Sequence, residues 1–512
     1  GCYFLSRPRR FGKSLIIGAL AELLKGNREL FKGLWIDSSD YNFKKYPVVT
    51  LNMVGSCDSK AALLDSIKTQ LDKAAQYNGL SLNELDIEKD SPPGNILIKL
   101  VSKLYYPERV RVAILIDEYD APIQKAIGDV AQAKINRGVL SDFYSSIKSL
   151  VDDDMTGLVF VTGVTKFAKA SIFSGFNNLF DMTLNSEYNA ICGFTLEEFR
   201  GYFLDYLPGI LERYKSNGFI PPEADLDYLI EEIVGYYDGY SWDVKTRVLN
   251  PYSIIQALEQ KKLKAHWFSS GAPSLLMTLL KREGSRFSFP ENPQMSETSL
   301  AAVDIKNLKL TPLLFQTGYL TIDKKLSRDS YLLRRPNKEV SEATDKSLVK
   351  YLLGQRDISI AKLRERIGKA LEVYDSAALA ASFQEILLWN SHRELKACEG
   401  QCHGLIFSVL KALGFSVITQ PVTVEGVFDI LLTLGKRVAF VFELKYESFS
   451  AALGQGEEGA KKIEEMLKAA IKEAKDQIQR RDYDAKYGPE YGVVKKVAVA
   501  FVGKARVAVE IY

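Results

Sequence analysis

The sequence has 512 residues, which at about 150 residues per domain predicts several domains. Its 67 basic and 64 acidic residues leave a formal net charge of +3, so bulk charge does not indicate a nucleic-acid-binding protein and any such surface must be local. We find no apolar run of about 20 residues and no signal peptide, and we therefore expect no membrane span and a cytoplasmic location. The five scattered cysteines indicate free thiols.

The first part of the chain alternates short β-rich runs with longer stretches of helical period. Such alternation predicts an α/β unit with a parallel sheet that is covered on both faces. The four runs are residues 3–6, 46–53, 111–117 and 157–163.

The middle of the chain changes character. Helical periodicity dominates from about residue 194 to residue 290, and residues 284–297 are rich in Pro, Ser, Asn and Glu, which is typical of a linker. Residues 313–322 and 331–337 then predict a helix followed by a β-hairpin. We interpret this stretch as a small winged-helix-like connector.

The last part predicts a second α/β unit. Residues 358–395 are helical in pattern, and a further helix is expected over 399–413. Strands, a long charged helix and two final strands follow, over residues 415–420, 427–434, 437–445, 457–486, 495–503 and 506–512.

A phosphate-binding loop is indicated by the stretch RPRRFGKSL at residues 7–15. Gly12, Lys13 and Ser14 form the end of the pattern G-x-x-x-x-G-K-[ST], although Arg7 stands where the first glycine is expected. At the start of a helix, backbone amides favour phosphate, Lys13 can reach the β- and γ-phosphates, and the Ser14 hydroxyl can bind Mg²⁺. The chain begins at Gly1 only a few residues earlier, so we expect a preceding natural segment to be missing.

The second half of an ATPase site follows about a hundred residues later. RVAILIDEYDAP is an apolar strand that ends in Asp117 and Glu118. Asp117 is expected to bind Mg²⁺, and Glu118 to orient or deprotonate the attacking water. Thr162 ends the next strand, where it either lies near the γ-phosphate or only caps the strand.

The motifs RPRRFGKSL, LIDEYDAPI, VTGVTKFAKASIFSGFNNL, ICGFTLEEF, YYDGYSWD with VLNPYSI, and LLFQTGYLTI occur in this order. In this the chain resembles the AAA-ATPase-like family that carries a C-terminal nuclease-type domain. The arginine run is part of that family's pattern, so the resemblance implies an altered phosphate loop in which Arg7, Arg9 and Arg10 replace the glycine-rich approach. It implies ATP as the ligand, with Arg9 and Arg10 among its contacts. Whether YYDGYSWD packs or binds stays open.

Three charged residues of the last part suggest a metal-dependent hydrolase. Asp429 lies in one predicted strand, and Glu443 and Lys445 lie in the next. Because side chains alternate along a strand, Glu443 and Lys445 share a face. Asp429 and Glu443 could bind one Mg²⁺ or Mn²⁺ ion, and Lys445 could position or deprotonate a water near a scissile phosphate. The same pattern also fits a surface salt bridge.

The D…E-x-K pattern, with its predicted helix, three strands, helix and strand, resembles the PD-(D/E)XK nuclease superfamily. The resemblance implies a restriction-endonuclease-like α/β core over residues 399–503. It also aligns Glu399 on the preceding helix, and Gln477 on the long helix, with side chains of the active site.

Together these patterns predict an α/β multidomain protein with a P-loop NTPase (AAA-like) parallel sheet. We expect an ATPase core over 1–190, a helical lid over 191–290, a connector over 291–375 and a nuclease-like domain over 376–512. The leading hypothesis is an ATP-binding switch fused to a Mg²⁺-dependent nuclease that acts on nucleic acid, with DNA as the first choice. The alternative is a regulatory NTPase whose nuclease-like domain only binds, which is favoured by Val427 where the superfamily usually has arginine. A homo-oligomer is compatible with both.

Overall fold

The structure is a computed structural model of the chain, and it divides into two compact units. The first comprises Gly1–Ala272 and Pro290–Val340, and the second comprises Pro273–Phe289 and Ser341–Tyr512. The described residues are all except 86, 89, 168–178, 270–275, 280–289, 291, 302, 304–308, 353–358, 391–398, 420–429, 435–437, 449–456, 481–490 and 504–505; the side chains of 301, 352, 389, 390, 399–401 and 419 are not described either.

A parallel five-stranded sheet forms the centre of the first unit, as the sequence predicted. Its strand order is β2-β3-β4-β1-β5, so β4 lies between β1 and β3. Each of the four runs predicted as strands is confirmed, and a short fifth strand is added. The bounds are β1 Cys2–Ser6, β2 Val48–Asn52, β3 Val112–Asp117, β4 Thr156–Gly163 and β5 Leu179–Asp181.

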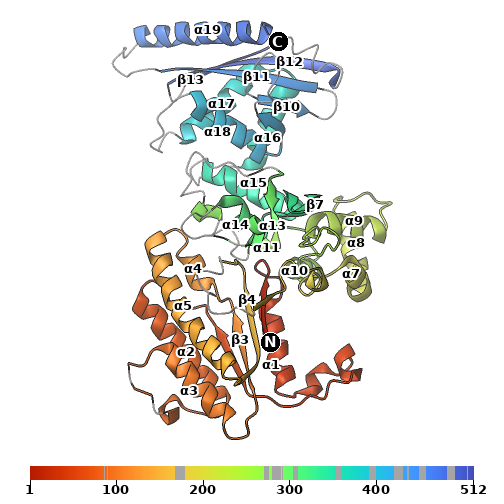
Figure 1. Cartoon of the computed structure of the whole chain (residues 1–512). Helices are drawn as coiled ribbons and strands as arrows, with labels where there is room; N and C mark the ends of the chain where they lie inside the picture. Colours follow the sequence, from red (N-terminus) through yellow and green to blue (C-terminus); the bar gives the residue numbers. More distant parts are fainter. Residues whose placement is uncertain are drawn as a thin grey trace. The chain divides into compact units, whose positions relative to one another are not determined.

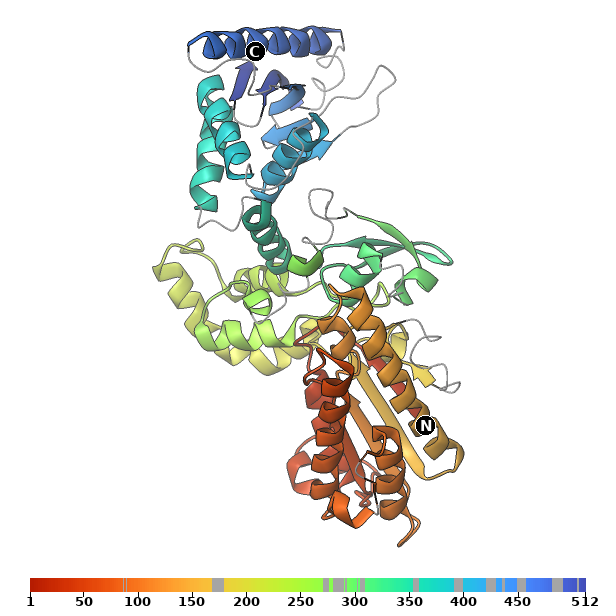
Figure 2. The same ribbon diagram turned by 90° about the vertical axis from the view of Figure 1, so that its left-hand side faces the viewer.

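Helices cover both faces of this sheet, because apolar side chains alternate to both sides of its strands. Helix α1 (Lys13–Leu24) contacts β2, β3 and β4 on one face. On the other face α2 (Lys60–Tyr77), α3 (Pro93–Tyr105) and α5 (Val130–Asp152) lie side by side and share one apolar core with the strands (Figures 1 and 2). The shorter elements are η1 Arg28–Phe31, η2 Trp35–Ser38, η3 Leu82–Leu85 and α4 Ala121–Lys125.

A helical region follows β5, which confirms the change of period seen in the sequence. It packs around its own apolar core, which includes Phe199, Leu229 and Ile254. Its elements are η4 Ser186–Tyr188, α7 Leu196–Phe203, η5 Leu204–Tyr206, α8 Pro208–Ser216, α9 Leu226–Tyr237, α10 Pro251–Gln260 and α11 His266–Ser269.

The connector contains the predicted helix and hairpin. Helix α14 (Leu310–Gln316) precedes β7 (Thr321–Ser327) and β8 (Ser330–Arg334), which pair antiparallel. The predicted linker is wrong at its end, because β6 (Gln294–Ser296) pairs with β8 and α13 (Glu297–Ala301) follows it. A three-residue strand is too short to show periodicity, and its partner lies more than thirty residues later in the chain. Most of the remaining linker lies outside the described residues.

The second unit is built on another five-stranded sheet, with the order β13-β12-β11-β10-β9. Strands β11 and β12 are parallel and the other pairs are antiparallel. This arrangement confirms the predicted α/β layout. The bounds are α15 Lys338–Leu352, α16 Ile360–Glu372, α17 Ser376–Asn390, α18 Glu399–Ala412, β9 Ser416–Thr419, β10 Ile430–Leu434, β11 Val438–Glu447, α19 Glu457–Gln479, β12 Val493–Val502 and β13 Arg506–Ile511.

Of the described helices, none combines the length and the apolar character that a membrane crossing requires.

A buried carboxylate within the first unit, which extends to Val340, joins the first residues of α15 to the helical region. Glu339 is fully buried and accepts hydrogen bonds from the Ser253 hydroxyl, at 2.9 Å to each oxygen, and from the Trp267 backbone amide at 2.8 Å. Burial raises the pKa of Glu339 from 4.5 to about 8, and the hydrogen bonds only partly oppose this rise. The folded protein therefore holds a proton there at neutral pH.

This proton makes stability depend on pH. The unfolded chain ionises Glu339 near its ordinary pKa of 4.5, whereas the folded protein retains the proton up to about 8. Between these values the folded state binds more protons, so the free energy of unfolding should fall as pH rises, by at most about 1.4 kcal/mol per pH unit. We expect Glu339→Gln to remove this fall in urea unfolding at a series of pH values. Glu342→Gln, an exposed change on the same helix, should keep it; equal slopes in all three proteins would contradict the assignment.

Candidate functional site

The phosphate loop lies between β1 and α1. Gly12 precedes the helix with φ 91° and ψ 10°, and Arg10 also has a positive φ of 68°. Such left-handed conformations favour glycine, which explains why a glycine stands directly before Lys13. The turn makes Lys13 and Ser14 the first residues of α1, where backbone amides lack helical partners.

Lys13 is turned back onto the loop. Its side chain is buried, and its ammonium donates to the carbonyl oxygens of Arg7 and Pro8, each at 2.9 Å. Burial lowers the pKa of Lys13, while Cys192 and the acidic side chains at and just after the end of β3 counteract this effect. A phosphate oxygen at the loop would compete with these two carbonyls for the same ammonium protons.

The carboxylate of Asp117 is held between two hydroxyls. Ser14 Oγ donates to Oδ2 at 2.5 Å, and Thr162 Oγ1 donates to Oδ1 at 2.7 Å. Asp117 ends β3 and is 3% exposed. A serine hydroxyl beside a carboxylate is the hard oxygen donor set that Mg²⁺ prefers, so these residues fit the ion. The structure thus brings Ser14, Asp117 and Thr162 together, and the Thr162 hydroxyl bonds the Asp117 carboxylate at the end of β4.

Glu118 follows Asp117 in an unusual backbone conformation. Its φ is 50°, in the left-handed region that non-glycine residues seldom occupy. The side chain is half-buried. The residue therefore lies beside the Ser14–Asp117 pair but is held by a strained backbone.

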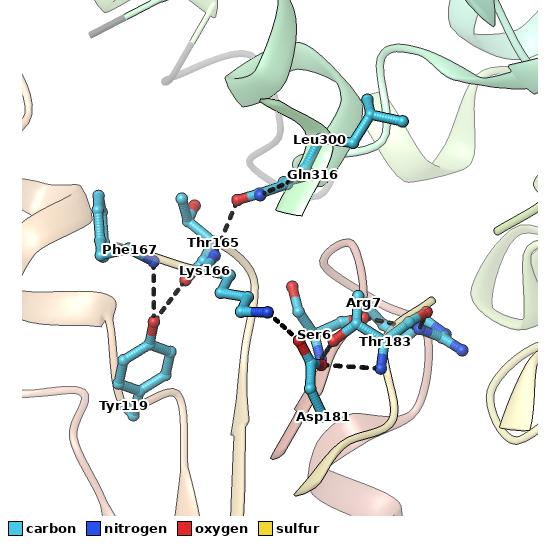
Figure 3. Close-up of polar contacts among 10 residues, drawn as sticks. All are labelled: Ser6, Arg7, Tyr119, Thr165, Lys166, Phe167, Asp181, Thr183, Leu300 and Gln316. Atoms are coloured by element: carbon cyan, nitrogen blue, oxygen red, sulfur yellow. Dashed lines mark hydrogen bonds and ion pairs between the residues drawn. The ribbon is translucent and has the colours of Figure 1, made fainter. Parts of the chain in front are cut away.

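Arg7 does not face the loop. Its side chain is fully buried and donates to the carbonyl oxygens of Ser6 at 2.9 Å and Thr183 at 3.0 Å (Figure 3). It also donates to the Tyr188 carbonyl at 2.9 Å. The guanidinium carbon lies 4.0 Å from the centre of the Trp242 ring. Burial lowers the pKa of Arg7 to about 10, so the group stays charged at neutral pH. Arg7 is a structural brace, unlike the phosphate-loop role that the resemblance implied for it.

Arg9 and Arg10 are exposed, and their roles stay predictions. Arg9 Nη2 donates to Gln124 Oε1 at 3.2 Å, which joins the loop to α4. The Arg10 guanidinium lies 5.2 Å from the ring centre of Tyr252. Both cations therefore lie at the surface of the loop.

Aromatic residues from distant parts of the sequence support the outer side of the loop. Phe11 is buried edge-on against Tyr240 and Trp242, with ring centres 4.7 and 5.8 Å apart. Trp267 Nε1 donates to the Arg9 carbonyl at 2.9 Å. Tyr240 and Trp242 of the motif YYDGYSWD thus pack against the loop. No local signal in the sequence indicates the partner of Trp267, because the two residues are 258 positions apart.

The second candidate site lies on β11. Glu443 and Lys445 alternate with Leu444, and they continue the face on which Val441 packs against Ala470 and other residues of α19. Glu443 is 2% exposed. Lys445 Nζ lies 3.3 Å from Glu473 Oε1 on α19. The predicted shared face is therefore observed.

The other predicted residues of this site are only partly described. Asp429 lies outside the described residues, directly before Ile430, which pairs with Phe442 next to Glu443. Glu399 begins α18, but its side chain is not described. Gln477 is half-buried near the end of α19.

A tyrosine near Glu443 was not anticipated. Burial, together with the charges of Glu510, Asp476 and Glu443, raises the pKa of Tyr512 to about 12. Glu443 thus shares its surroundings with Asp476 of α19 and with the residue that follows β13. No group of three or more metal-ligating side chains occurs among the described residues, a set that excludes Asp429.

Comparisons with known proteins agree with this architecture. Residues 1–173 match the family model described as "Predicted AAA-ATPase", and residues 397–511 match that of the PD-(D/E)XK nuclease superfamily. The chain is also similar to "Uncharacterized protein in vnfD 5'region" from Azotobacter chroococcum mcd 1, with 29% identity over 460 residues that cover 88% of this chain and 83% of that protein. The first segment thus matches the AAA-ATPase-like family model and the last matches that of the nuclease superfamily, which confirms both resemblances for these segments.

An experiment can distinguish a structural role of Arg7 from a role in binding phosphate. Arg7→Lys keeps the charge but leaves buried carbonyl oxygens without donors, and should lower the free energy of unfolding by about 2–4 kcal/mol without nucleotide. Arg9→Lys, at the exposed position, should change it by less than about 0.5 kcal/mol. Urea unfolding of the three proteins measures this difference. A fully stable Arg7→Lys variant would contradict the structural role.

Proposed function

We propose that this chain, which combines an AAA-ATPase-like segment with a PD-(D/E)XK segment, binds and hydrolyses ATP and cleaves DNA in a metal-dependent reaction that nucleotide controls. The observation that carries the ATP half is the placement of Asp117 between the hydroxyls of Ser14 and Thr162. In this proposal the chain has four domains, 1–190, 191–290, 291–375 and 376–512, and acts in the cytoplasm. Its oligomeric state is left to direct measurement.

The residues around the phosphate loop have distinct roles in this proposal. Lys13 leaves the carbonyls of Arg7 and Pro8 to bind the β- and γ-phosphates, while Ser14 and Asp117 hold Mg²⁺. The ion, when bound, neutralises charge on the phosphate oxygens. Arg9 and Arg10, exposed on the loop, add positive charge toward the nucleotide. Glu118 orients the attacking water and accepts its proton, and Thr162 keeps the Asp117 carboxylate turned toward Ser14.

The nuclease half rests on the shared face of Glu443 and Lys445. Glu443, with Asp429, is proposed to hold Mg²⁺ or Mn²⁺, which would supply an acidified water and stabilise the leaving oxygen. Lys445 positions that water and can take its proton. Glu399 and Gln477 are proposed to complete the site from the flanking helices. DNA is chosen over RNA because of the superfamily, and RNA is an outcome of the test.

The ATP site is tested with Asp117→Asn. Removing the ionised carboxylate should lower ATP hydrolysis by about a hundredfold or more. A matched control is Asp154→Asn, which alters an exposed carboxylate that pairs with Arg111. Phosphate release by the purified proteins with ATP and Mg²⁺ measures this effect. Unchanged hydrolysis in Asp117→Asn would refute the assignment.

The nuclease site is tested by cleavage of supercoiled and linear DNA, beside an RNA of the same sequence, with Mg²⁺ or Mn²⁺ and with or without ATP. Lys445→Ala should lower cleavage by about a hundredfold, whereas Lys468→Ala, which alters an exposed pair on α19, should not. Dependence on ATP that is lost in Asp117→Asn would support coupling. A folded protein that binds ATP but cleaves nothing would instead support the regulatory NTPase with an inactive nuclease-like domain.

A further inference from the structure

The segment after Asp117 is fixed to the segment after β4. Tyr119 is fully buried, and its hydroxyl donates to the Thr165 carbonyl at 2.8 Å and accepts from the Phe167 amide at 3.2 Å. Its own amide donates to the Thr162 carbonyl at 3.0 Å. The strained Glu118 therefore has a rigid neighbour on its C-terminal side.

Asp120 makes a second set of bonds to the same segment. Its carboxylate is 1% exposed and accepts from the backbone amides of Val164 at 3.2 Å and Thr165 at 2.6 Å. Gly163 has no room for a side chain, since a Cβ atom there would come within 2.5 Å of the Tyr119 ring. The ends of β3 and β4 thus form one close-packed body around Glu118.

The connector holds this body from its outer side. The Lys166 amide donates to Gln316 Oε1 at 2.8 Å, and Gln316 Nε2 donates to the Leu300 carbonyl at 2.8 Å. The Val303 amide donates to the Lys166 carbonyl at 2.9 Å. Figure 3 shows Thr165, Lys166 and Phe167 lying between Tyr119 on one side and Gln316 on the other.

Two further contacts fix the position of Lys166. Its ammonium pairs with Asp181 of β5, and both side chains are largely buried. The Asp181 carboxylate also accepts from the Thr183 amide at 3.0 Å. Since Gln316 is itself only 6% exposed at the end of α14, the bond between Gln316 and Lys166 is shielded from water.

We propose that Gln316 is a positioning residue for ATP hydrolysis, because it holds Glu118 in place through Lys166 and Tyr119. A left-handed conformation at a non-glycine residue persists only when its surroundings enforce it. The bonds from Gln316 and Tyr119 enforce it here from two sides of residues 165–167. The connector thereby sets the position of the proposed base, and this inference rests on the ATPase activity proposed above.

The first test is Gln316→Leu, which removes both side-chain bonds at similar volume. We expect kcat for ATP to fall by between about tenfold and a hundredfold, because a shift of about 1 Å at a catalytic group has that effect. The Kd for ATP, measured by fluorescence of a labelled nucleotide, should change by less than about threefold, since the loop residues that bind phosphate are untouched. A purely structural role would lower kcat and raise the Kd together.

Asn337→Leu is the matched control. Asn337 is also buried, accepts from the Val340 amide at 3.1 Å and donates to the Asp238 carbonyl at 2.9 Å. The free energy of unfolding in urea should fall by a similar amount in Asn337→Leu and in Gln316→Leu, but Asn337→Leu should keep the wild-type kcat.

The second test is Tyr119→Phe, compared with Tyr237→Phe. The Tyr237 hydroxyl makes the same two kinds of bond, to the Lys264 carbonyl and from the Lys264 amide, each at 3.0 Å. Tyr119→Phe should lower kcat alone, and its effect should be less than additive with Gln316→Leu, since both act on residues 165–167. Tyr237→Phe should leave kcat unchanged.

The outcomes distinguish failure of this inference from failure of the proposed ATPase activity. If the wild-type protein binds but does not hydrolyse ATP, the proposed ATPase fails and the inference fails with it. If the wild type hydrolyses ATP and Gln316→Leu does so at the same rate, or if kcat falls equally in Asn337→Leu, only the inference is overturned.

Discussion

The proposed ATP site depends on one buried carboxylate, Asp117, which is bonded by residues of two other segments. Because β4 lies between β1 and β3, the ends of β1 and β3 are about 10 Å apart, twice the spacing of neighbouring strands. Ser14 crosses this gap from the first turn of α1, and Thr162 fills it from the end of β4. A buried Asp117 without these hydroxyls would be costly, since an unpaired carboxylate loses its hydration. The strand order and the site therefore require each other.

The loop that carries Lys13 is likewise held in place by residues that are distant in the sequence. In place of a second glycine, Arg7 is turned away from the loop and bonds three carbonyl oxygens, while its ring contact with Trp242 joins the loop to the helical region. Gly318 of the connector approaches the loop from another side, with room for no Cβ atom beside Pro8. The loop is thus rigid because distant segments pack on it, and a change in any of them reaches the phosphate site.

The sequence predicted the fold of both units well, because their strands are apolar runs and their helices have a clear period. It also predicted that Ser14 and Asp117 meet, since parallel strands end at one edge of a sheet, and that Glu443 and Lys445 share a face, since side chains alternate. It missed β6, which is too short to show a pattern. It could not predict the roles of Arg7, Trp267 or Gln316, because their partners are set by tertiary packing between residues far apart in the chain. Asp429 and the side chain of Glu399 lie outside the described residues, so their placement stays a prediction.

Ligand binding at the phosphate loop must be an exchange of hydrogen bonds rather than a gain of new ones. The donors of Lys13 already bond the carbonyls of Arg7 and Pro8, and the Ser14 hydroxyl already bonds Asp117. When a phosphate binds the Lys13 ammonium, the carbonyls of Arg7 and Pro8 lose a charged donor. The Arg9 carbonyl keeps its hydrogen bond from the Trp267 indole. Affinity is then the difference between two satisfied states, which is small compared with either. A loop of this kind responds to modest changes in its support, so under the proposed function the residues packed around it would contribute to nucleotide binding without touching the nucleotide.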